Sequence, residues 1–182
     1  MDAAFYTRPV LELARALIGC TLLIDGVGGV IVETEAYHAG DPASHSFVGP
    51  SLRNRAMWGP PGHAYVYRIY GLHWCLNVVG GAAPGAAVLL RAIEPVHGLA
   101  PMRARRGGVA DRLLCAGPGR LAQALAITGA LDGRPLDEPP FCLLPRRTEP
   151  AIATGQRIGI TKAADEPWRF GLAGSAFLSR RM

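Results

Sequence analysis

The chain has 182 residues, 49% of them hydrophobic, and a formal net charge of +5. This length suits one domain over residues 1–182 whose core needs no disulfide or metal, and no apolar stretch is long enough to span a bilayer. The four cysteines form no CxxC pair and no cluster with histidines at zinc-binding spacing, so we expect buried free thiols in a reduced, cytoplasmic protein. The net charge favours a polyanionic partner.

Hydrophobic periodicity and the positions of Gly and Pro predict the elements in chain order. Helices are expected at residues 9–19, within the basic stretch 97–113, and from residue 120 onward. Strands are expected at residues 21–25, 30–37, 63–70, 74–81, 86–95, 157–161 and 168–174. The proline-rich stretch 131–150 is expected to be a surface loop. Because strands occur at both ends of the chain, we expect them to share one antiparallel sheet.

The strand expected at residues 30–37 places Ile31, Glu33, Glu35 and Tyr37 on one face by its alternation. Glutamates are frequent on exposed faces, so this segment alone favours a solvated surface. The alternative is a pair of carboxylates and a phenol that line a site. Other segments have to decide between the two.

Arg91 lies within the almost wholly apolar run AAVLLRAIEP. An unpaired guanidinium would be costly there, so we expect a carboxylate partner, and the strand glutamate Glu35 is the natural candidate. Either this pair is purely structural, or it lies in a pocket and holds a water between its two side chains. In the second case Arg91 keeps Glu35 ionised as a general base.

Three tyrosines occupy the run AYVYRIYGLHW, and Tyr70 comes directly before the Gly71 turn. Aromatic residues inside strands usually pack, but one at an exposed hairpin tip has little to bury against. Tyr70 therefore suits a wedge pushed between base steps of a duplex, with arginines on the phosphates around it. Lys162 is the only lysine among the 19 Lys and Arg residues. Guanidinium groups suit phosphates and base edges, although a GC-rich genome produces the same bias.

His45 follows the loop HAGDPAS and by itself indicates only a surface histidine. Together with Tyr37 and Tyr67 it makes a set of rings that can sandwich a purine. The GPG sequence at residues 117–119 is either a phosphate-binding helix start or a plain turn.

Several long blocks resemble the alkyladenine (3-methyladenine) DNA glycosylase family: VETEAY, DPASHS, RNRAMWGPPG, YVYRIYGLHWCLNVV, VLLRAIEP and CAGPGRLAQAL. The resemblance runs from Phe5 to about Ser179. It implies a single-domain α+β fold with a curved antiparallel β-sheet, surrounding helices and a protruding β-hairpin. Leu72 and His73 stand where the family more often has Met and an aromatic residue.

The resemblance also implies roles for individual residues. It makes Glu35 the general base, with Arg91 and the backbone carbonyl of Ile158 helping to hold the water. It places Tyr37 on one side of a flipped base. The remaining binding roles fall to His45 and Tyr67 on the other side of that base, Asn77 against the 2-amino group of guanine, and Tyr70 in the gap left in the duplex.

An alkylated purine is cationic and leaves readily, so the enzyme has to stabilise oxocarbenium character on the sugar and deliver water. A neutral lesion such as hypoxanthine also needs a proton or a strong hydrogen bond, for which the backbone or ring of His45 is the candidate donor. Strand nicking needs an amine, and Lys162 sits in a polar turn, so we expect a monofunctional glycosylase. We expect a monomer on double-stranded DNA containing a damaged purine, with no metal, cofactor, membrane or obligate protein partner.

Two other functions remain open from the residues themselves. Glu33 and Glu35 project the same way from one strand and could serve a glycoside hydrolase as its carboxylate pair, although the basic charge argues against this. A non-catalytic minor-groove module could use Tyr70 to bend DNA. Burial of Glu35 beside Arg91, with room for a water, distinguishes the glycosylase from such a module.

Overall fold

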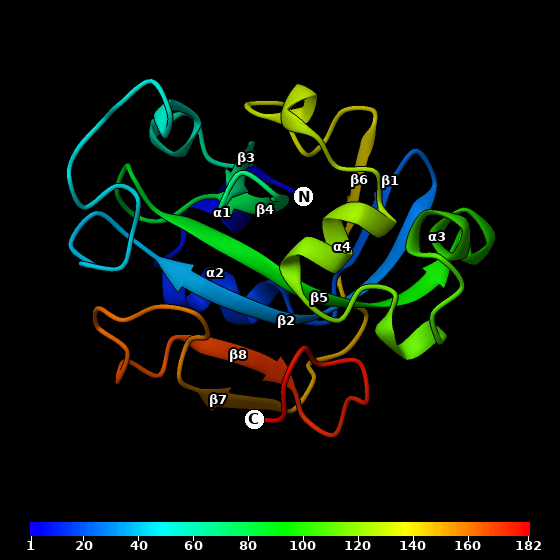
Figure 1. The fold of residues 1–182 in the computed structure, drawn as a ribbon. Coiled ribbons are helices and arrows are strands. Elements are labelled where there is room, and N and C mark those ends of the chain that lie inside the picture. Colours follow the sequence, from blue (N-terminus) through cyan, green and yellow to red (C-terminus); the bar gives the residue numbers. More distant parts are fainter.

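The computed structural model describes residues 1–182 (Figure 1). Its centre is one curled, eight-stranded sheet in which every pair of neighbouring strands is antiparallel. The strands are β1 (Thr21–Ile24), β2 (Val27–Tyr37), β3 (Ala64–Ile69), β4 (His73–Val79), β5 (Ala87–His97), β6 (Phe141–Leu144), β7 (Ile152–Gly155) and β8 (Arg169–Leu172). The order is β3-β4-β5-β2-β1-β6, with β8 also paired to β2 and β7 paired to β8. The α+β fold with a curved antiparallel sheet is confirmed.

Short helices surround this sheet. They are α1 (Ala3–Thr7), α2 (Val10–Leu17), α3 (Leu99–Arg106) and α4 (Pro118–Ala124), with 3-10 turns η1 (Arg55–Trp58), η2 (Asp111–Leu113) and η3 (Gly129–Leu131). The longest have eight residues, and none is long and apolar enough to cross a membrane. In Figure 1, α2 lies against β2 while α3 and α4 lie beside the end of β5.

Strand β2 is the axis of the sheet. One edge of β2 pairs with β5 along almost its whole length, and its other edge pairs first with β1 and then with β8. Gly28 and Gly29 lie where the neighbouring strands leave no room for a side chain. A Cβ on Gly28 would lie 1.9 Å from the carbonyl oxygen of Leu22, and one on Gly29 would lie 1.9 Å from that of Glu94. Glycine therefore permits β2 to be central.

Two irregularities of the β2–β5 pairing fall at the middle of β2. Ile31 pairs with Ile93 and Glu33 with Ala92, so Val32 is an extra residue on β2; Thr34 then pairs with Leu90. Arg91 is consequently the extra residue on β5. Bulges bend strands and re-aim side chains. Here they place Arg91 beside the glutamates of β2.

One cluster of 31 buried apolar residues forms the core and includes residues of α2, α4 and most strands. A smaller cluster of Met57, Tyr65, Val79 and Ala87 lies apart from it, and Tyr37 and Tyr67 pack against this second cluster. The second cluster therefore supports aromatic rings that are only partly buried.

Some expectations for the second half of the chain are wrong. Residues 157–161 are not a strand: β7 ends at Gly155, and the side chain of Arg157 is buried in an ion pair with Asp41 instead of facing a sheet. The 131–150 stretch is not all loop, because it contains the edge strand β6. Alternate residues of β6 are exposed, and Cys142 is one of them, so the expectation of buried thiols holds only for the other three cysteines.

Candidate active site

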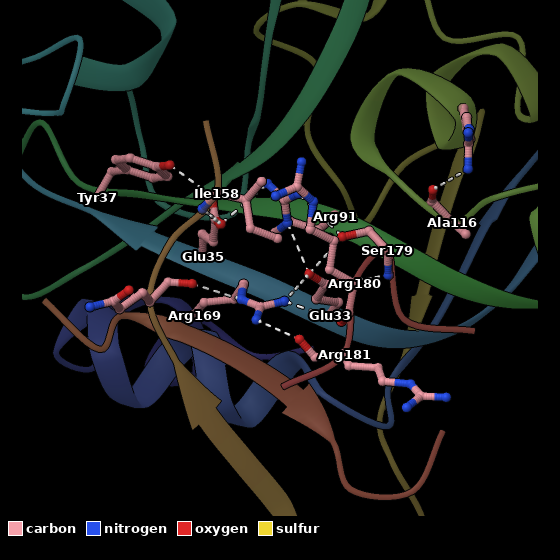
Figure 2. A network of polar contacts seen from close by, with 12 residues as sticks. Glu33, Glu35, Tyr37, Arg91, Ala116, Ile158, Arg169, Ser179, Arg180 and Arg181 are labelled. Atoms are coloured by element: carbon pink, nitrogen blue, oxygen red, sulfur yellow. Dashed lines mark hydrogen bonds and ion pairs between the residues drawn. The ribbon is translucent and has the colours of Figure 1, made fainter. Parts of the chain in front are cut away.

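Glu33 and Glu35 lie side by side on β2 and are both fully buried, with no exposed surface. The interpretation of this strand face as a solvated surface is therefore wrong. Strand β2 pairs on both edges at this point, and each flanking strand supplies one arginine, Arg91 from β5 and Arg169 from β8. Figure 2 shows the two carboxylates and Arg91 pointing toward one another.

Glu35 accepts three hydrogen bonds or charge contacts. Its Oε1 lies 3.2 Å from Arg91 Nη1 and 2.8 Å from the backbone nitrogen of Ile158, and its Oε2 accepts from the Tyr37 hydroxyl over 2.8 Å. Arg91 and Glu35 thus meet directly, and the Ile158 group in contact is the N–H rather than the carbonyl. Glu35 and Glu33 raise the pKa of Arg91, although burial opposes this, so Arg91 stays charged.

Glu33 differs from Glu35 in how completely its oxygens are used. Its Oε1 receives Arg91 Nε at 3.0 Å, Arg169 Nη1 at 3.0 Å and the Ser179 hydroxyl at 2.8 Å, and its Oε2 receives the Ser179 N–H. A carboxylate offers about four acceptor positions. Glu33 accepts four donors, three of them on Oε1, while Glu35 accepts three and keeps one position on Oε2. Of the two carboxylates, Glu35 is the one with fewer donors and the one that contacts Tyr37.

Tyr37, the hydroxyl partner of Glu35, lines a cavity of about 320 Å³, which is within the range of small-molecule sites. Its lining is mostly apolar and aromatic: Tyr37, Ala43, Ser44, His45, Arg53, Met57, Tyr65, Tyr67, Ile69, Tyr70, Asn77, Gly159 and Ile160. All five residues expected to bind the base or the duplex are in this lining. Tyr37 joins the cavity to the buried charges, since its ring lines the cavity and its hydroxyl contacts Glu35.

The wall formed by β3 is a stack of rings. Tyr65 and Tyr67 stack with centroids 5.4 Å apart, and His45 meets Tyr67 edge-on at 4.5 Å. The Tyr65 hydroxyl lies 2.8 Å from His45 Nδ1 and fixes the plane of the imidazole. Partial burial of the ring and the nearby Arg53 lower the pKa of His45, which is therefore neutral at pH 7.

Tyr37 is held from behind by a buried cation. Arg157 lies between the rings of Tyr37 and Trp168, at 4.7 and 4.9 Å from their centroids, and forms a fully buried ion pair with Asp41. Burial and the adjacent Glu35 carboxylate raise the pKa of Tyr37, so its hydroxyl stays protonated and donates. The same arginine precedes Ile158, whose N–H contacts Glu35.

Asn77 is buried on β4 and donates from Nδ2 to the Tyr65 carbonyl oxygen over 3.0 Å, which fixes its side chain at the cavity. Tyr70 ends the same lining at the tip of the β3–β4 hairpin and is 82% exposed. Its φ of +51° and that of Gly71, +67°, suit a primed turn. A bulky residue rarely adopts this conformation, and such strain concentrates at functional sites.

Sequence reasoning missed several residues of this site. Tyr65 lies in the tyrosine-rich run AYVYRIYGLHW but was not among the residues expected to bind the base. Arg169 resembles Arg91 in lying within an apolar strand, which was a usable signal. Asp41 and Ser179 carry no local pattern that points to the site. No three or more His, Cys, Asp or Glu side chains gather as metal ligands would.

A buried carboxylate paired with an arginine behind a pocket of aromatic rings defines an enzyme site for a planar ligand. The family model described as Methylpurine-DNA glycosylase (MPG) matches residues 4–176, and the chain belongs to that family. It is a DNA glycosylase, a repair enzyme that hydrolyses N-glycosidic bonds in DNA.

Bacterial relatives share this sequence over almost its whole length. The chain is 59% identical to a protein of Agrobacterium fabrum over 98% of this chain and 91% of the relative. It is 59% identical to one of Rhizobium meliloti, over 99% and 96%, and 62% identical to one of Rhodopseudomonas palustris, over 96% and 88%. All three carry the name "Putative 3-methyladenine DNA glycosylase".

The two other functions considered from the sequence are wrong. A glycoside hydrolase with a Glu33/Glu35 pair would need both carboxylates to reach substrate, but Glu33 contacts only Arg91, Arg169 and Ser179, none of which lines the cavity, and the family of this chain is one of DNA glycosylases. A non-catalytic DNA-bending module is excluded by membership of a glycosylase family.

Proposed function

We propose that this enzyme flips an alkylated or deaminated purine out of duplex DNA and hydrolyses its N-glycosidic bond with a water activated by Glu35. The substrate class is that of 3-methyladenine, 7-methylguanine, hypoxanthine and ethenoadenine. The observation that carries the proposal is the acceptor position left on Glu35 Oε2, whose donor Tyr37 lines the aromatic cavity. We propose that it acts as a monomer on cytoplasmic DNA.

The extruded base would occupy the cavity against Tyr37, with His45 and Tyr67 on its other side. Flipped bases are read by stacking between aromatic side chains, and these three rings line one cavity of suitable size. For an alkylated purine, the bond from its glycosidic nitrogen to C1′ breaks and its electron pair neutralises the cationic base. The water oxygen bonds to C1′ while Glu35 takes the proton from that water.

For a neutral lesion, the imidazole of His45 would donate a hydrogen bond to the leaving base. The Tyr65 hydroxyl, 2.8 Å from His45 Nδ1, can donate to that nitrogen and leave the ring proton on Nε2. Nε2 would then donate to the leaving base. Asn77 would exclude guanine by contact with its 2-amino group, which a fixed side chain does better than a mobile one.

Tyr70 would fill the gap that the base leaves. It is the large exposed aromatic side chain of the hairpin tip, it borders the cavity, and its strained backbone holds the ring outward. An inserted ring restores part of the stacking that base extrusion breaks.

We infer that the enzyme leaves the strand intact. A lysine becomes a Schiff-base nucleophile when it is desolvated in an apolar pocket or lies beside another cation. Lys162 is exposed, although it borders a second cavity of about 400 Å³ that shares His45 with the first. Borohydride should therefore trap no covalent adduct with DNA, and a trapped band lost in Lys162→Ala would overturn this inference.

The test of the whole proposal is direct. Duplexes containing hypoxanthine, 1,N6-ethenoadenine or 3-methyladenine are incubated with the protein, and abasic sites are scored by alkaline cleavage. Base release from one or more of these duplexes, and not from an undamaged one, supports the proposal. Absence of release from all three would refute it.

A further inference from the structure

Glu33 is a buried charge that the proposed reaction does not use. It is fully buried, it accepts four hydrogen bonds, and its partners come from β5, β8 and the segment before the C-terminus. We propose that Glu33 is a positioning residue which, with Ser179, fixes the Arg91 guanidinium against the catalytic carboxylate of Glu35. This inference rests on the function proposed above.

Arg91 is held at three of its nitrogen atoms. Its Nε donates to Glu33 over 3.0 Å, its Nη1 lies 3.2 Å from Glu35, and its Nη2 donates to the Ser179 hydroxyl over 3.2 Å. A guanidinium is planar and rigid, so contacts at Nε and Nη2 determine where Nη1 lies. Two of the three contacts that fix this plane belong to the network around Glu33, and the third is the contact with Glu35 itself.

Arg169 connects Glu33 to the other partner of Glu35. It donates from Nη1 to Glu33 and, over 2.8 Å, from Nε to the carbonyl oxygen of Gln156. Gln156 is two residues before Ile158, whose N–H contacts Glu35 Oε1. The network around Glu33 therefore supports both groups that hold Oε1, the Arg91 cation on one side and the Ile158 amide on the other.

The segment before the C-terminus closes this network (Figure 2). Ser179 contacts Glu33 through both its N–H and its hydroxyl, and Arg169 donates to the carbonyl oxygens of Arg180 and Arg181. Two carboxylates and two guanidiniums, each at most 5% exposed, thus balance one another's charge. A buried carboxylate without these partners would be costly, so the segment completes the site.

The experiment compares Glu33→Gln with wild type in single-turnover excision of ethenoadenine. Because Gln keeps the shape but loses the charge that holds Arg91, the excision rate should fall roughly 10- to 100-fold, as for small misplacements of catalytic groups. The dissociation constant for lesion DNA and the fluorescence change of base extrusion should stay within about twofold of wild type. Glu94→Gln is the matched control, since Glu94 lies on the adjacent β5 and pairs with no cation.

A double mutant separates positioning from a general structural effect. If Glu33 acts through Arg91 on Glu35, adding Glu33→Gln to Glu35→Gln should lower excision by less than about twofold, because coupled residues are not additive. An equal loss in both backgrounds would overturn the inference. So would a Glu33→Gln enzyme as fast as wild type, whereas absence of excision by wild type itself would refute the proposed function instead.

If Glu33→Gln does not fold, Ser179→Ala tests whether the network around Glu33 positions Arg91. It removes the hydroxyl contacts to Glu33 and Arg91 but no charge, and we expect excision to fall about 3- to 10-fold with unchanged lesion affinity, as for one lost hydrogen bond. Ser175→Ala, in the same segment but outside the network, is the control and should match wild type. Equal rates for both serine variants would overturn the inference.

Discussion

The Tyr37 hydroxyl donates to Oε2 of Glu35 over 2.8 Å, from two residues further along β2. Both side chains project from the same face of the strand, so the ring that is proposed to stack on the base also orients the proposed catalytic carboxylate. Base binding and water activation therefore meet at one side chain.

Tyr37→Phe keeps the ring and removes this contact. We expect an excision rate about 10-fold lower with lesion affinity within about twofold of wild type, because a hydrogen bond to a charged group contributes more than a neutral one. Tyr6→Phe is the control, since the buried Tyr6 hydroxyl has no hydrogen-bond partner. Equal single-turnover rates for Tyr37→Phe and wild type would remove the hydroxyl from the mechanism.

The same pair of enzymes has a defined pH dependence. Burial and Glu35 raise the pKa of Tyr37 above its ordinary value of 10.0, so the hydroxyl stays protonated throughout pH 7 to 10 and its contribution is lost only above that range. The ratio of wild-type to Tyr37→Phe rates should therefore be constant between pH 7 and 10. A ratio that falls toward one by pH 9 would show that the hydroxyl ionises early.

Tyr70→Gly should make the protein more stable and the enzyme less effective. Glycine accepts the φ of +51° without strain, and little burial is lost from a side chain that is 82% exposed, so unfolding should cost about 0.5 to 1 kcal/mol more. Extrusion of a base analogue should weaken, most for well-paired lesions. Leu72→Gly, at an exposed neighbour without positive φ, should lower stability instead. Urea unfolding that shows no gain for Tyr70→Gly would contradict the strain argument.

Asn77→Ser should relax the rejection of guanine. The shorter side chain leaves room for the 2-amino group, so release of undamaged guanine should rise by roughly 10-fold or more while excision of ethenoadenine changes little. Guanine release is counted on long undamaged duplex DNA. An unchanged count would mean that selection lies elsewhere in the pocket.

Asp41→Asn should destabilise the fold strongly. It leaves the fully buried Arg157 without its carboxylate, and breaking such a pair costs about 3 to 5 kcal/mol. Asp111→Asn breaks the solvent-exposed pair with Arg103 and should lower stability far less, because exposed ion pairs contribute little. Equal midpoints of denaturant unfolding for the two variants would show that the buried pair does not stabilise the fold more than the exposed one.

The sequence predicted the sheet and the cavity residues because strand alternation and the tyrosine-rich hairpin are local patterns. The link between Arg91 and a strand glutamate followed from the cost of an unpaired guanidinium in an apolar run. The sequence did not reveal that Arg91 pairs with Glu33 as well as with Glu35. The two bulges that shift the register of β2 against β5 do not change the alternation of polar and apolar residues.

The segment at residues 157–161 shows why the other contacts of the site could not be predicted from the sequence. Its alternation imitates a strand, but Arg157 pairs with Asp41, which is 116 residues away in sequence, and the Ile158 N–H contacts Glu35 instead of a neighbouring strand. Contacts between such distant loops depend on the folded sheet, and no local pattern encodes them.

The central claim is that Glu35 activates the water, and Glu35→Gln tests it most directly. Single-turnover excision of ethenoadenine is measured alongside lesion affinity and base extrusion for Glu35→Gln and wild type. We expect excision to fall about 100-fold or more, the range for loss of a general base, while affinity and extrusion are preserved. Near-wild-type excision by Glu35→Gln would contradict the account.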